Sequence, residues 1–502
     1  MVDRLVEFAQ KRPYSIILAV LLFRFAYLFV NGLDLIGDES YYWDWSRRPD
    51  WCYYSKPPMV AWLIGLSTWL GGDYTAVVRL PAVVLGTVFL VFFYAVANVF
   101  FNRKAAAIAL LMVLAMPFNA LANLVMTIDP PLYCFWIISL YFLHNALFKQ
   151  QPYAWFWAGL ATAAAVLSKQ TALLLPLVVG VFLALDYDRR KLFKREFLIY
   201  LAPIIVCIIP ILLWNQQHDW VMFGHSKGHF GVKESASWIK RLDDTASFEF
   251  YQMLLATPVL YPAILMMTWR AGFKFKQLTA KEQFLLLSGP FLLAIIIVLS
   301  LIQKVQGNWP IPFYFSALIL LAGQYAEGNW QKTMPRGLLT GFAMVLITYA
   351  LPLLIQIFNL HHTVVDPTYR FRHWHELASA IDSERRNIIS DQQQTFILTL
   401  GHRYLASELA FYLPDHPKTF RYEPSGLITS QYEVWPGPIN YIGKQGLIIT
   451  EQNPDQIPVE LKSAFQSFKE VATVVNPMNI NSPYHLYLGT DLKSWPPQKA
   501  IF

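Results

Sequence analysis

Long apolar stretches separated by short polar connections dominate the chain as far as Ile357. An α-helix needs about 20 apolar residues to cross a bilayer, and the stretches recur at close to that length. We therefore predict about eleven transmembrane helices, of which two are shorter than the rest. The expected ranges are 14–30, 77–100, 105–122, 130–148, 153–168, 171–185, 197–214, 250–269, 283–302, 309–323 and 337–357.

The pattern then changes to shorter apolar runs separated by polar and turn-forming residues. Residues 395–400 and 446–450 have the composition of strands, and 403–413 places apolar residues on one face of a helix. These features predict a small α/β domain of roughly 140 residues, which is large enough to hold its own core. We therefore expect an α-helical polytopic membrane protein with two parts, a transmembrane domain (1–358) and a soluble C-terminal domain (359–502).

The composition also indicates a membrane protein. Of the 502 residues, 55% are hydrophobic and only 15% are charged, whereas soluble domains carry about 25% charged residues. The net charge of +7 is explained by lysines and arginines in the connections between helices, where they favour the cytoplasmic side. Their distribution places the N-terminus inside, and it places the first loop (about 31–76) and the C-terminal domain outside. It does not indicate binding to nucleic acid.

The first loop contains an apolar segment of its own, from Pro58 to Leu70. With about a dozen residues this segment is too short to span a bilayer. We expect a helix that lies along the membrane surface, with Trp and Tyr at the depth of the lipid headgroups. The cysteines argue against a disulfide framework, because Cys134 and Cys207 fall inside predicted helices and Cys52 lacks an evident partner.

Two adjacent carboxylates, Asp38 and Glu39, follow the first apolar stretch. Sugar transfer from a phosphate-linked donor needs a base that takes the proton of the acceptor hydroxyl, and cations that hold the departing phosphate. The pair is therefore the candidate catalytic site, although an acidic interfacial loop would have the same composition. Neighbouring carboxylates can share a cation. A divalent metal held by this pair stays open, and the sequence requires no cofactor.

A lysine and an arginine that could hold a phosphate follow this pair. Lys56 precedes two prolines that fix the backbone, and lysine suits a phosphate as a compact point charge. Arg79 lies at the outer end of the second predicted helix and is a second candidate for the phosphate. Either side chain could instead extend from the membrane toward the headgroups. Tyr54, in the same loop as Lys56, is a supporting candidate.

Other polar residues fall on the outer face of the predicted topology. Asp129 precedes Pro130, which is the ordinary start of a helix, but its carboxylate could also face an external cavity. Arg24 lies inside the first apolar segment, where a charge either extends outward or faces the protein interior and could orient the acidic pair. The remaining supporting candidates are Lys169, Lys304 and Asn308.

Patterns of other enzyme classes are missing from the sequence. The His-x-x-x-His and Cys-x-x-Cys spacings of zinc sites do not occur. Neither a Walker loop nor a Gly-x-Gly-x-x-Gly fingerprint is present, and the outer side of a membrane has no nucleotide supply. A donor sugar carried by a lipid is therefore favoured over a nucleotide sugar.

Several segments resemble the bacterial branch of the GT-C glycosyltransferases. These are relatives of the protein O-mannosyltransferases and include the aminoarabinose and galacturonic acid transferases that act on lipid A. The resemblance covers nearly the whole chain. The segments that carry it are Gly37-Asp38-Glu39-Ser40-Tyr41-Tyr42-Trp43, Tyr53-Tyr54-Ser55-Lys56-Pro57-Pro58-Met59-Val60-Ala61-Trp62-Leu63, Arg79-Leu80-Pro81, Ile128-Asp129-Pro130-Pro131-Leu132, Gln306-Gly307-Asn308-Trp309-Pro310, Ala406-Ser407-Glu408-Leu409-Ala410-Phe411-Tyr412-Leu413-Pro414 and Ser430-Gln431-Tyr432.

The resemblance implies a GT-C fold in the bacterial inner membrane, a polyprenyl-phosphate sugar donor such as undecaprenyl phosphate, and an inverting displacement in a large external cavity. It makes Asp38 the general base and Lys56 the residue that binds the donor phosphate, with Glu39, Arg79 and Asp129 in support. The implied acceptor is lipid A or the lipopolysaccharide core, with a protein or another envelope glycan as the alternative.

The chain departs from that family at one position. The aminoarabinose transferases carry an arginine three residues after the aspartate, where this chain has Tyr41, so their sugar and acceptor do not transfer directly. A transporter or flippase of lipid-linked sugars is the rival class. Transporters usually have internal repeats and polar residues at mid-membrane, whereas the polar residues here gather at one face and no repeat is evident.

Overall fold

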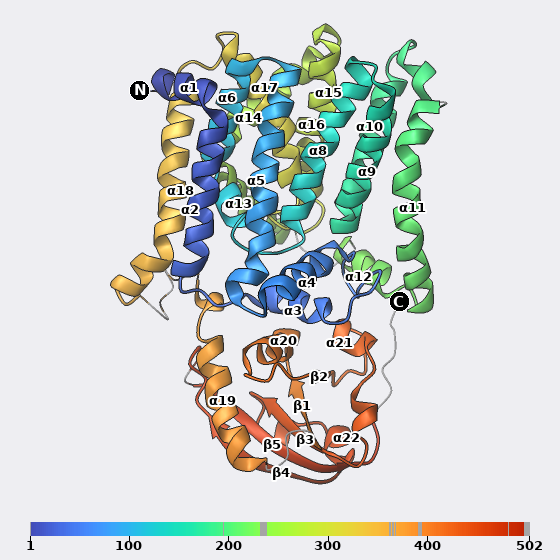
Figure 1. Cartoon of the computed structure of the whole chain (residues 1–502), viewed down its shortest axis with the longest axis vertical. Helices are drawn as coiled ribbons and strands as arrows, with labels where there is room; N and C mark the ends of the chain where they lie inside the picture. Colours follow the sequence, from blue (N-terminus) through green and yellow to red (C-terminus); the bar gives the residue numbers. More distant parts are fainter. Residues whose placement is uncertain are drawn as a thin grey trace. The chain divides into compact units, whose positions relative to one another are not determined.

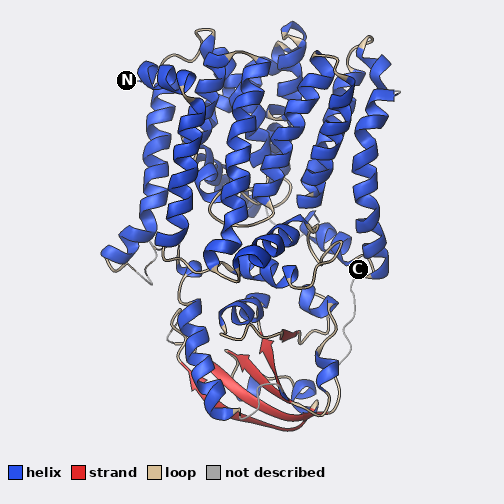
Figure 2. Ribbon diagram, in the orientation of Figure 1, coloured by secondary structure: helices blue, strands red, loops and turns tan. Residues whose placement is uncertain are grey.

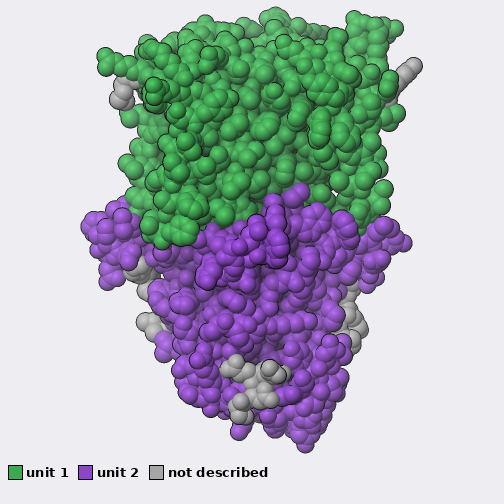
Figure 3. All heavy atoms as spheres, viewed as in Figure 1, with its two compact units in different colours: residues 1–30, 79–211, 229–351 green, residues 31–78, 212–228, 352–502 purple. Residues whose placement is uncertain are grey.

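The computed structural model describes residues 2–193, 195–230, 238–360, 363, 366, 368–389, 394–479 and 481–495 (Figures 1 and 2). The described residues form two compact units, which Figure 3 shows in green and purple. Unit 1 consists of 1–30, 79–211 and 229–351, and unit 2 consists of 31–78, 212–228 and 352–502. The first loop therefore belongs to the same unit as the C-terminal part of the chain.

Unit 1 is helical throughout, and its long helices run side by side in Figure 1. Its helices, three of which continue into unit 2, are α1 Val2–Lys11, α2 Pro13–Val30, α5 Thr75–Phe100, α6 Arg103–Leu114, α7 Pro117–Ala122, α8 Asp129–Phe148, α9 Pro152–Ser168, η1 Gln170–Leu173, α10 Leu174–Ala184, η2 Arg189–Phe193, α11 Arg195–Gln217, α13 Trp238–Ala256, α14 Leu260–Phe273, η3 Phe275–Gln277, α15 Ala280–Ser288, α16 Pro290–Ser300, α17 Ile311–Ala326 and α18 Thr333–Ile357.

Six helical stretches among the described residues are long and apolar enough to cross a membrane. They are α2, α5, α8, α11, α15 with α16, and α18, and they coincide with six of the eleven expected spans. Four other expected spans, 105–122, 153–168, 171–185 and 309–323, are helical but consist of shorter helices. The unit is thus the polytopic helical domain that the hydrophobic pattern predicts.

The expected span 250–269 is wrong as a single helix. The chain bends by 107° between α13 and α14, because Thr257 has a left-handed φ of 68° and Pro258 cannot donate a backbone hydrogen bond. The expected span 105–122 also breaks, at Met116, whose extended backbone (φ −94°, ψ 125°) is what the proline that follows requires. Proline therefore accounts for both breaks.

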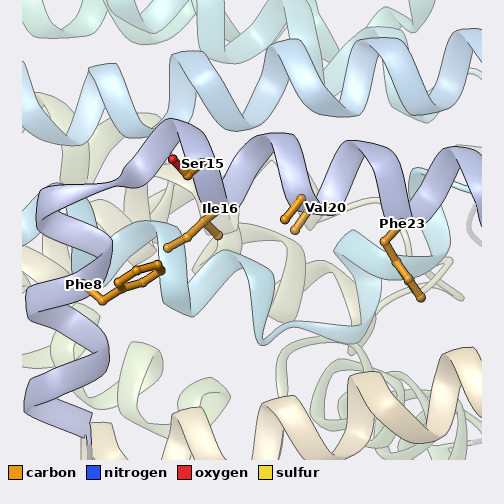
Figure 4. A pocket seen from close by; sticks show the side chains of 6 residues that line it. Phe8, Ser15, Ile16, Val20 and Phe23 are labelled. Atoms are coloured by element: carbon orange, nitrogen blue, oxygen red, sulfur yellow. The ribbon is translucent and has the colours of Figure 1, made fainter.

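An open apolar groove runs along α1 and α2 (Figure 4). Its volume is about 360 Å³. The residues that line it are Phe8, Ser15, Ile16, Ala19, Val20 and Phe23. Because a serine hydroxyl is the one polar side-chain group among these lining residues, the groove suits hydrocarbon and offers no groups for acid–base chemistry.

Unit 2 contains an α/β domain, as the sequence predicts. Within the described residues its strands form one sheet in the order β2-β1-β3-β5-β4, with β1 parallel to β2 and β3, and β5 antiparallel to β3 and β4. The strands are β1 Thr395–Leu400, β2 Thr419–Tyr422, β3 Gln445–Thr450, β4 Phe465–Val474 and β5 Tyr484–Leu492. The helices are α3 Gly37–Ser46, α4 Met59–Gly71, α12 Val221–Phe230, η4 Tyr369–Phe371, α19 Trp374–Ile388, α20 Arg403–Tyr412, α21 Gln431–Val434, η6 Pro438–Tyr441, η7 Pro454–Gln456 and α22 Val459–Ser463.

The sheet has an apolar core on each face. Side chains alternate along a strand, so Ile397 and Leu447 pack with α19 and α20 on one face, while Leu398 and Ile448 pack with α22 on the other. The helix α3 of the first loop packs against α20. The packing of α3 on α20 places the acidic motif of the first loop against the C-terminal domain.

Candidate active site

Asp38 lies in the first turn of α3, at the boundary between the first loop and the C-terminal domain. Its Oδ1 accepts a hydrogen bond of 3.0 Å from the hydroxyl of Tyr404 and lies 3.7 Å from Nη2 of Arg403. Among the described residues no side chain or backbone group binds Oδ2. The side chain is 39% exposed. Asp38 is therefore a carboxylate with one oxygen held by the protein and the other open.

Glu39 has a different role from Asp38. It is fully buried, and its Oε2 accepts a hydrogen bond of 3.1 Å from the backbone N–H of Ile36, which caps the start of α3. Consecutive residues of a helix point about 100° apart, so the two carboxylates do not face each other. Within the described part of the chain, no group of three or more His, Cys, Asp or Glu residues could hold a metal ion.

Tyr404 reaches Asp38 because the residue that starts α3 is a glycine. A Cβ atom on Gly37 would lie 2.1 Å from the ring of Tyr404, which is far inside van der Waals contact. Burial, followed by the nearby charge of Asp38, raises the pKa of Tyr404 to about 12. The phenol therefore remains a hydrogen-bond donor to Asp38 at neutral pH.

Arg403 supplies the positive charge near Asp38. Its guanidinium lies 5.2 Å from the centre of the Tyr41 ring. The helix α20 thus brings an arginine to the aspartate from a distant part of the sequence, since Tyr404 is 366 positions from Asp38. Sequence reasoning missed both Arg403 and Tyr404, because no local pattern links them to the first loop.

Lys56 and Tyr54 belong to a segment that ring stacking and hydrogen bonds hold within unit 2. Tyr53 stacks on Trp45 of α3 with ring centres 4.4 Å apart, and its backbone N–H donates to the carbonyl of Lys56 at 3.1 Å. The backbone N–H of Tyr54 donates to Oε1 of Gln431 at 2.6 Å. Lys56 itself is half-buried and does not contact Asp38. Its assignment to the donor phosphate stays a prediction.

Three supporting candidates form a cluster in unit 1. Lys169 Nζ donates to Oδ1 of Asp129 at 2.8 Å, and Asn308 Nδ2 donates to Oδ2 at 2.7 Å. Asp129 is the first residue of α8 and Ile128 is its N-cap, so the interpretation of Asp129 as the N-cap is wrong. The cluster ties the start of α8 to the end of α9 and to the segment before α17.

The arginines of unit 1 are buried. Arg24 is 2% exposed and donates to the hydroxyl of Tyr349 at 3.1 Å and to the carbonyl of Asn119 at 2.9 Å. Arg79 is also 2% exposed, so neither arginine extends into the headgroups as an isolated side chain would. Lys304 is exposed. Unit 1 holds Arg24, Arg79, Asp129, Lys169, Lys304 and Asn308, whereas unit 2 holds Asp38, Glu39, Tyr54 and Lys56.

Comparisons with known proteins show what this chain is similar to. The sequence model of the dolichyl-phosphate-mannose-protein mannosyltransferases matches residues 55–214. The lipid A galacturonosyltransferase RgtD of Rhizobium johnstonii is 25% identical over 423 residues, which cover 83% of this chain and 86% of RgtD. The chain is similar to glycosyltransferases in these two comparisons.

The fold of the chain agrees with solved structures. The crystal structure of ArnT from Cupriavidus metallidurans in the apo state superposes with a TM-score of 0.63 at 17% identity, over 98% of this chain and all of ArnT. ArnT bound to undecaprenyl phosphate gives the same TM-score at 16% identity, over 94% of this chain and 97% of ArnT. The likeness confirms the GT-C fold that the sequence predicts.

The hydrogen bonds of the three carboxylates distinguish one that could take part in chemistry from two that have structural roles. The open Oδ2 of Asp38 can accept a proton, while Tyr404 and Arg403 keep Oδ1 in place. The carboxylates of Glu39 and Asp129 accept hydrogen bonds from other groups of the protein. Asp38 is therefore the residue best arranged for acid–base work.

Proposed function

We propose that the protein transfers one sugar from a polyprenyl-phosphate carrier to lipid A or to the lipopolysaccharide core. The relative RgtD is named as a lipid A galacturonosyltransferase, and a structure of the fold relative ArnT contains undecaprenyl phosphate. Both support a lipid-phosphate donor and a lipid A acceptor. The observation that carries the proposal is the open Oδ2 of Asp38 at the wall of a cavity of about 990 Å³.

The reaction is a single displacement at the anomeric carbon. Oδ2 of Asp38 takes the proton of the acceptor hydroxyl as its oxygen forms a bond to the anomeric carbon of the donor sugar. The bond between that carbon and the phosphate oxygen breaks on the opposite side, so the configuration inverts. The electron pair leaves with the carrier phosphate, whose charge is offset by Lys56.

Arg403 and Tyr404 orient the base. Both groups contact Oδ1 of Asp38, which directs the lone pairs of Oδ2 into the cavity. We also propose that transfer needs no divalent metal, because Glu39 is committed to the cap of α3 and leaves Asp38 without a second carboxylate ligand. Transfer by the purified protein should survive EDTA, and a loss that Mg²⁺ or Mn²⁺ reverses would contradict this.

The enzyme is proposed to lie in the bacterial inner membrane with unit 2 on the periplasmic side. The excess of lysines and arginines in the connections expected inside supports this orientation. Alkaline phosphatase fused after Phe502 should then be active, while the same enzyme fused after Lys149 should be inactive. The opposite pair of results would reverse the topology.

Mass spectrometry of lipid A, core and envelope glycans from cells with and without the chain tests the function. One defined sugar should be lost from lipid A or core when the chain is absent. A loss confined to glycoproteins would favour a protein acceptor, which the name of the matching family also suggests. If no glycan changes but lipid-linked sugars accumulate on one side of the membrane, a transporter is favoured and the proposal fails.

A further inference from the structure

A cavity of about 990 Å³ lies within unit 2, on the side of the sheet where the parallel strands end. Leu400 to His402, at the end of β1 and just after it, line the cavity together with Thr450 to Gln452, at the end of β3 and just after it. Asp38 and Tyr404 form another part of its wall. The carboxylate assigned as base therefore opens into a cavity built largely by the C-terminal domain.

The strand order explains why the cavity forms there. From β1 the chain continues to β2 on one side, and from β3 it continues toward β4 and β5 on the other. The two connections leave the neighbouring parallel strands in opposite directions, which opens a crevice at their carboxyl ends. In open α/β sheets this topological switch point is where ligands bind.

The wall of the cavity combines aromatic and amide groups. Trp374, Tyr369 and Phe371 supply aromatic rings, and Gln452 and Asn479 supply side-chain amides. Aromatic rings present flat apolar faces to a ligand, and each amide both donates and accepts hydrogen bonds. A sugar ring presents the same two kinds of surface, apolar C–H groups and hydroxyls.

Gln452 is a lining residue whose backbone is held in place. Its backbone N–H donates to Thr450 Oγ1 at 3.1 Å, and its carbonyl accepts from the hydroxyl of Tyr487 at 3.2 Å, so its position is fixed. Yet Oε1 of its side chain is buried and has no hydrogen-bond partner among the described residues. An atom that no water molecule can reach does not bond a ligand in the cavity, so Gln452 would bind a ligand through its side-chain NH2 group.

The charges of the wall argue against a phosphate ligand. The carboxylates of Asp38 and Glu451 line the cavity, and His402 is the one titratable nitrogen group among the described lining residues. The lining residues whose side chains the structure describes include no lysine or arginine, although phosphate sites rely on these cations. A neutral, hydroxyl-rich ligand fits this wall better than the phosphate of the sugar donor.

We infer that this cavity is the subsite for the acceptor glycan and takes neutral sugar units of it, which places an acceptor hydroxyl at Asp38. The inference rests on the proposed transfer to a glycan acceptor. The volume lies at the upper end of the range of about 300–1,000 Å³ seen for ligand sites, so the cavity has room for more than one sugar ring. Recognition comes from hydroxyl groups, and the lipid anchor of the acceptor is not needed for it.

The test uses the full-length protein in nanodiscs and the core oligosaccharide of the host cells after removal of its lipid. Binding is measured directly by calorimetry, and transfer is measured separately with lipid-linked donor. Gln452→Ala and Asn479→Ala should each weaken binding by about two- to tenfold, the loss of one neutral hydrogen bond. The same factor should appear in the KM for acceptor, with the KM for donor unchanged.

Controls separate this inference from the function on which it rests. Gln466→Ala, at an exposed position of β4, should leave acceptor binding unchanged. Dephosphorylation of the oligosaccharide should not weaken binding, and inorganic phosphate should not compete.

Binding that depends on the phosphates, or transfer with an acceptor KM that neither variant changes, would overturn the subsite alone. Binding without transfer to any acceptor would overturn the proposed function, and with it the role of the cavity as an acceptor subsite.

Discussion

Two aspartates of this chain show how the same side chain serves chemistry or structure. Asp38 is 39% exposed and has one oxygen without a partner among the described residues. Asp129 is 11% exposed and pairs one oxygen with Lys169 and the other with Asn308. A base must receive a proton from a substrate. The open oxygen of Asp38 therefore fits a base, whereas Asp129 fits a structural role.

The hydrogen bond from Tyr404 to Asp38 should increase the rate of sugar transfer. Tyr404→Phe removes a bond to a charged group, worth about 1.5 kcal/mol, so kcat should fall about tenfold while the KM for donor is unchanged. Because burial and the charge of Asp38 raise the pKa of Tyr404 to about 12, the phenol stays protonated below that pH. Between neutral pH and pH 10, the pH–rate profiles of wild type and variant should therefore have the same shape.

Tyr441→Phe is the matched control, since Tyr441 lies in the same domain and away from Asp38. It should leave kcat as in the wild type. A kcat for Tyr404→Phe equal to that of the control would remove Tyr404 from the site.

The buried pair of Asp129 and Lys169 should contribute to stability. Asp129→Ala leaves the Lys169 ammonium buried without its counter-charge, which should cost about 3–5 kcal/mol. Thermal unfolding in nanodiscs measures the loss, and Asp129→Leu combined with Lys169→Met should be much less destabilising than Asp129→Ala alone. Glu7→Ala, which breaks an exposed pair with Lys11, is the control and should leave the unfolding temperature unchanged.

A different outcome would reassign this cluster. If Asp129→Ala unfolds at the wild-type temperature yet abolishes transfer, the carboxylate acts in catalysis and the structural role is wrong.

At the scale of elements, the site depends on how closely α3 approaches α20. Gly37→Ala places a methyl group in the space of the Tyr404 ring, and overpacking of this kind costs about 1–3 kcal/mol. The ring must then move away from Asp38, so kcat should fall at least as far as in Tyr404→Phe. Thermal unfolding and single-turnover transfer measure the two effects.

A second variant background, Tyr404→Ala, tests whether the clash with the Tyr404 ring causes the loss of stability. In Tyr404→Ala protein the space is vacant, so adding Gly37→Ala should cost little further stability. Gly65→Ala in α4 is the control, since a Cβ there meets Ser46 at 3.4 Å, an ordinary contact distance. Equal destabilisation by Gly37→Ala in both backgrounds would show that the clash with Tyr404 is not the cause.

The elements that the sequence predicts correctly are those with a strong local pattern. The strands β1 and β3 are continuous apolar runs, buried as the central strands of the sheet, and α20 has a clear apolar face. The strands β2, β4 and β5 escaped prediction: β2 has only four residues, and β4 is an edge strand with mostly exposed positions. Long apolar stretches predict the helices, but proline and backbone conformation decide where they break.

At the scale of the whole molecule, the main difference between the sequence-based prediction and the structure is which segments share a unit. The first loop belongs with residues 352–502. The hydroxyl of Tyr41 accepts from the backbone N–H of Gln431 at 2.5 Å, and Tyr432 donates to Asp44 at 2.8 Å. Such contacts join segments nearly 400 positions apart, and a single sequence carries no periodic signal for them. For this reason the motif around Asp38 was predictable while its partners Arg403 and Tyr404 were not.

The central claim is that Asp38 is the base of a sugar transfer to an envelope glycan. Cells that lack the chain are complemented with the wild type, with Asp38→Asn or with Asp455→Asn, an exposed aspartate of the same unit, at equal levels of inserted protein. Mass spectrometry of lipid A and core should find the added sugar with the wild type and Asp455→Asn, and not with Asp38→Asn. A full glycan profile with Asp38→Asn would contradict the account.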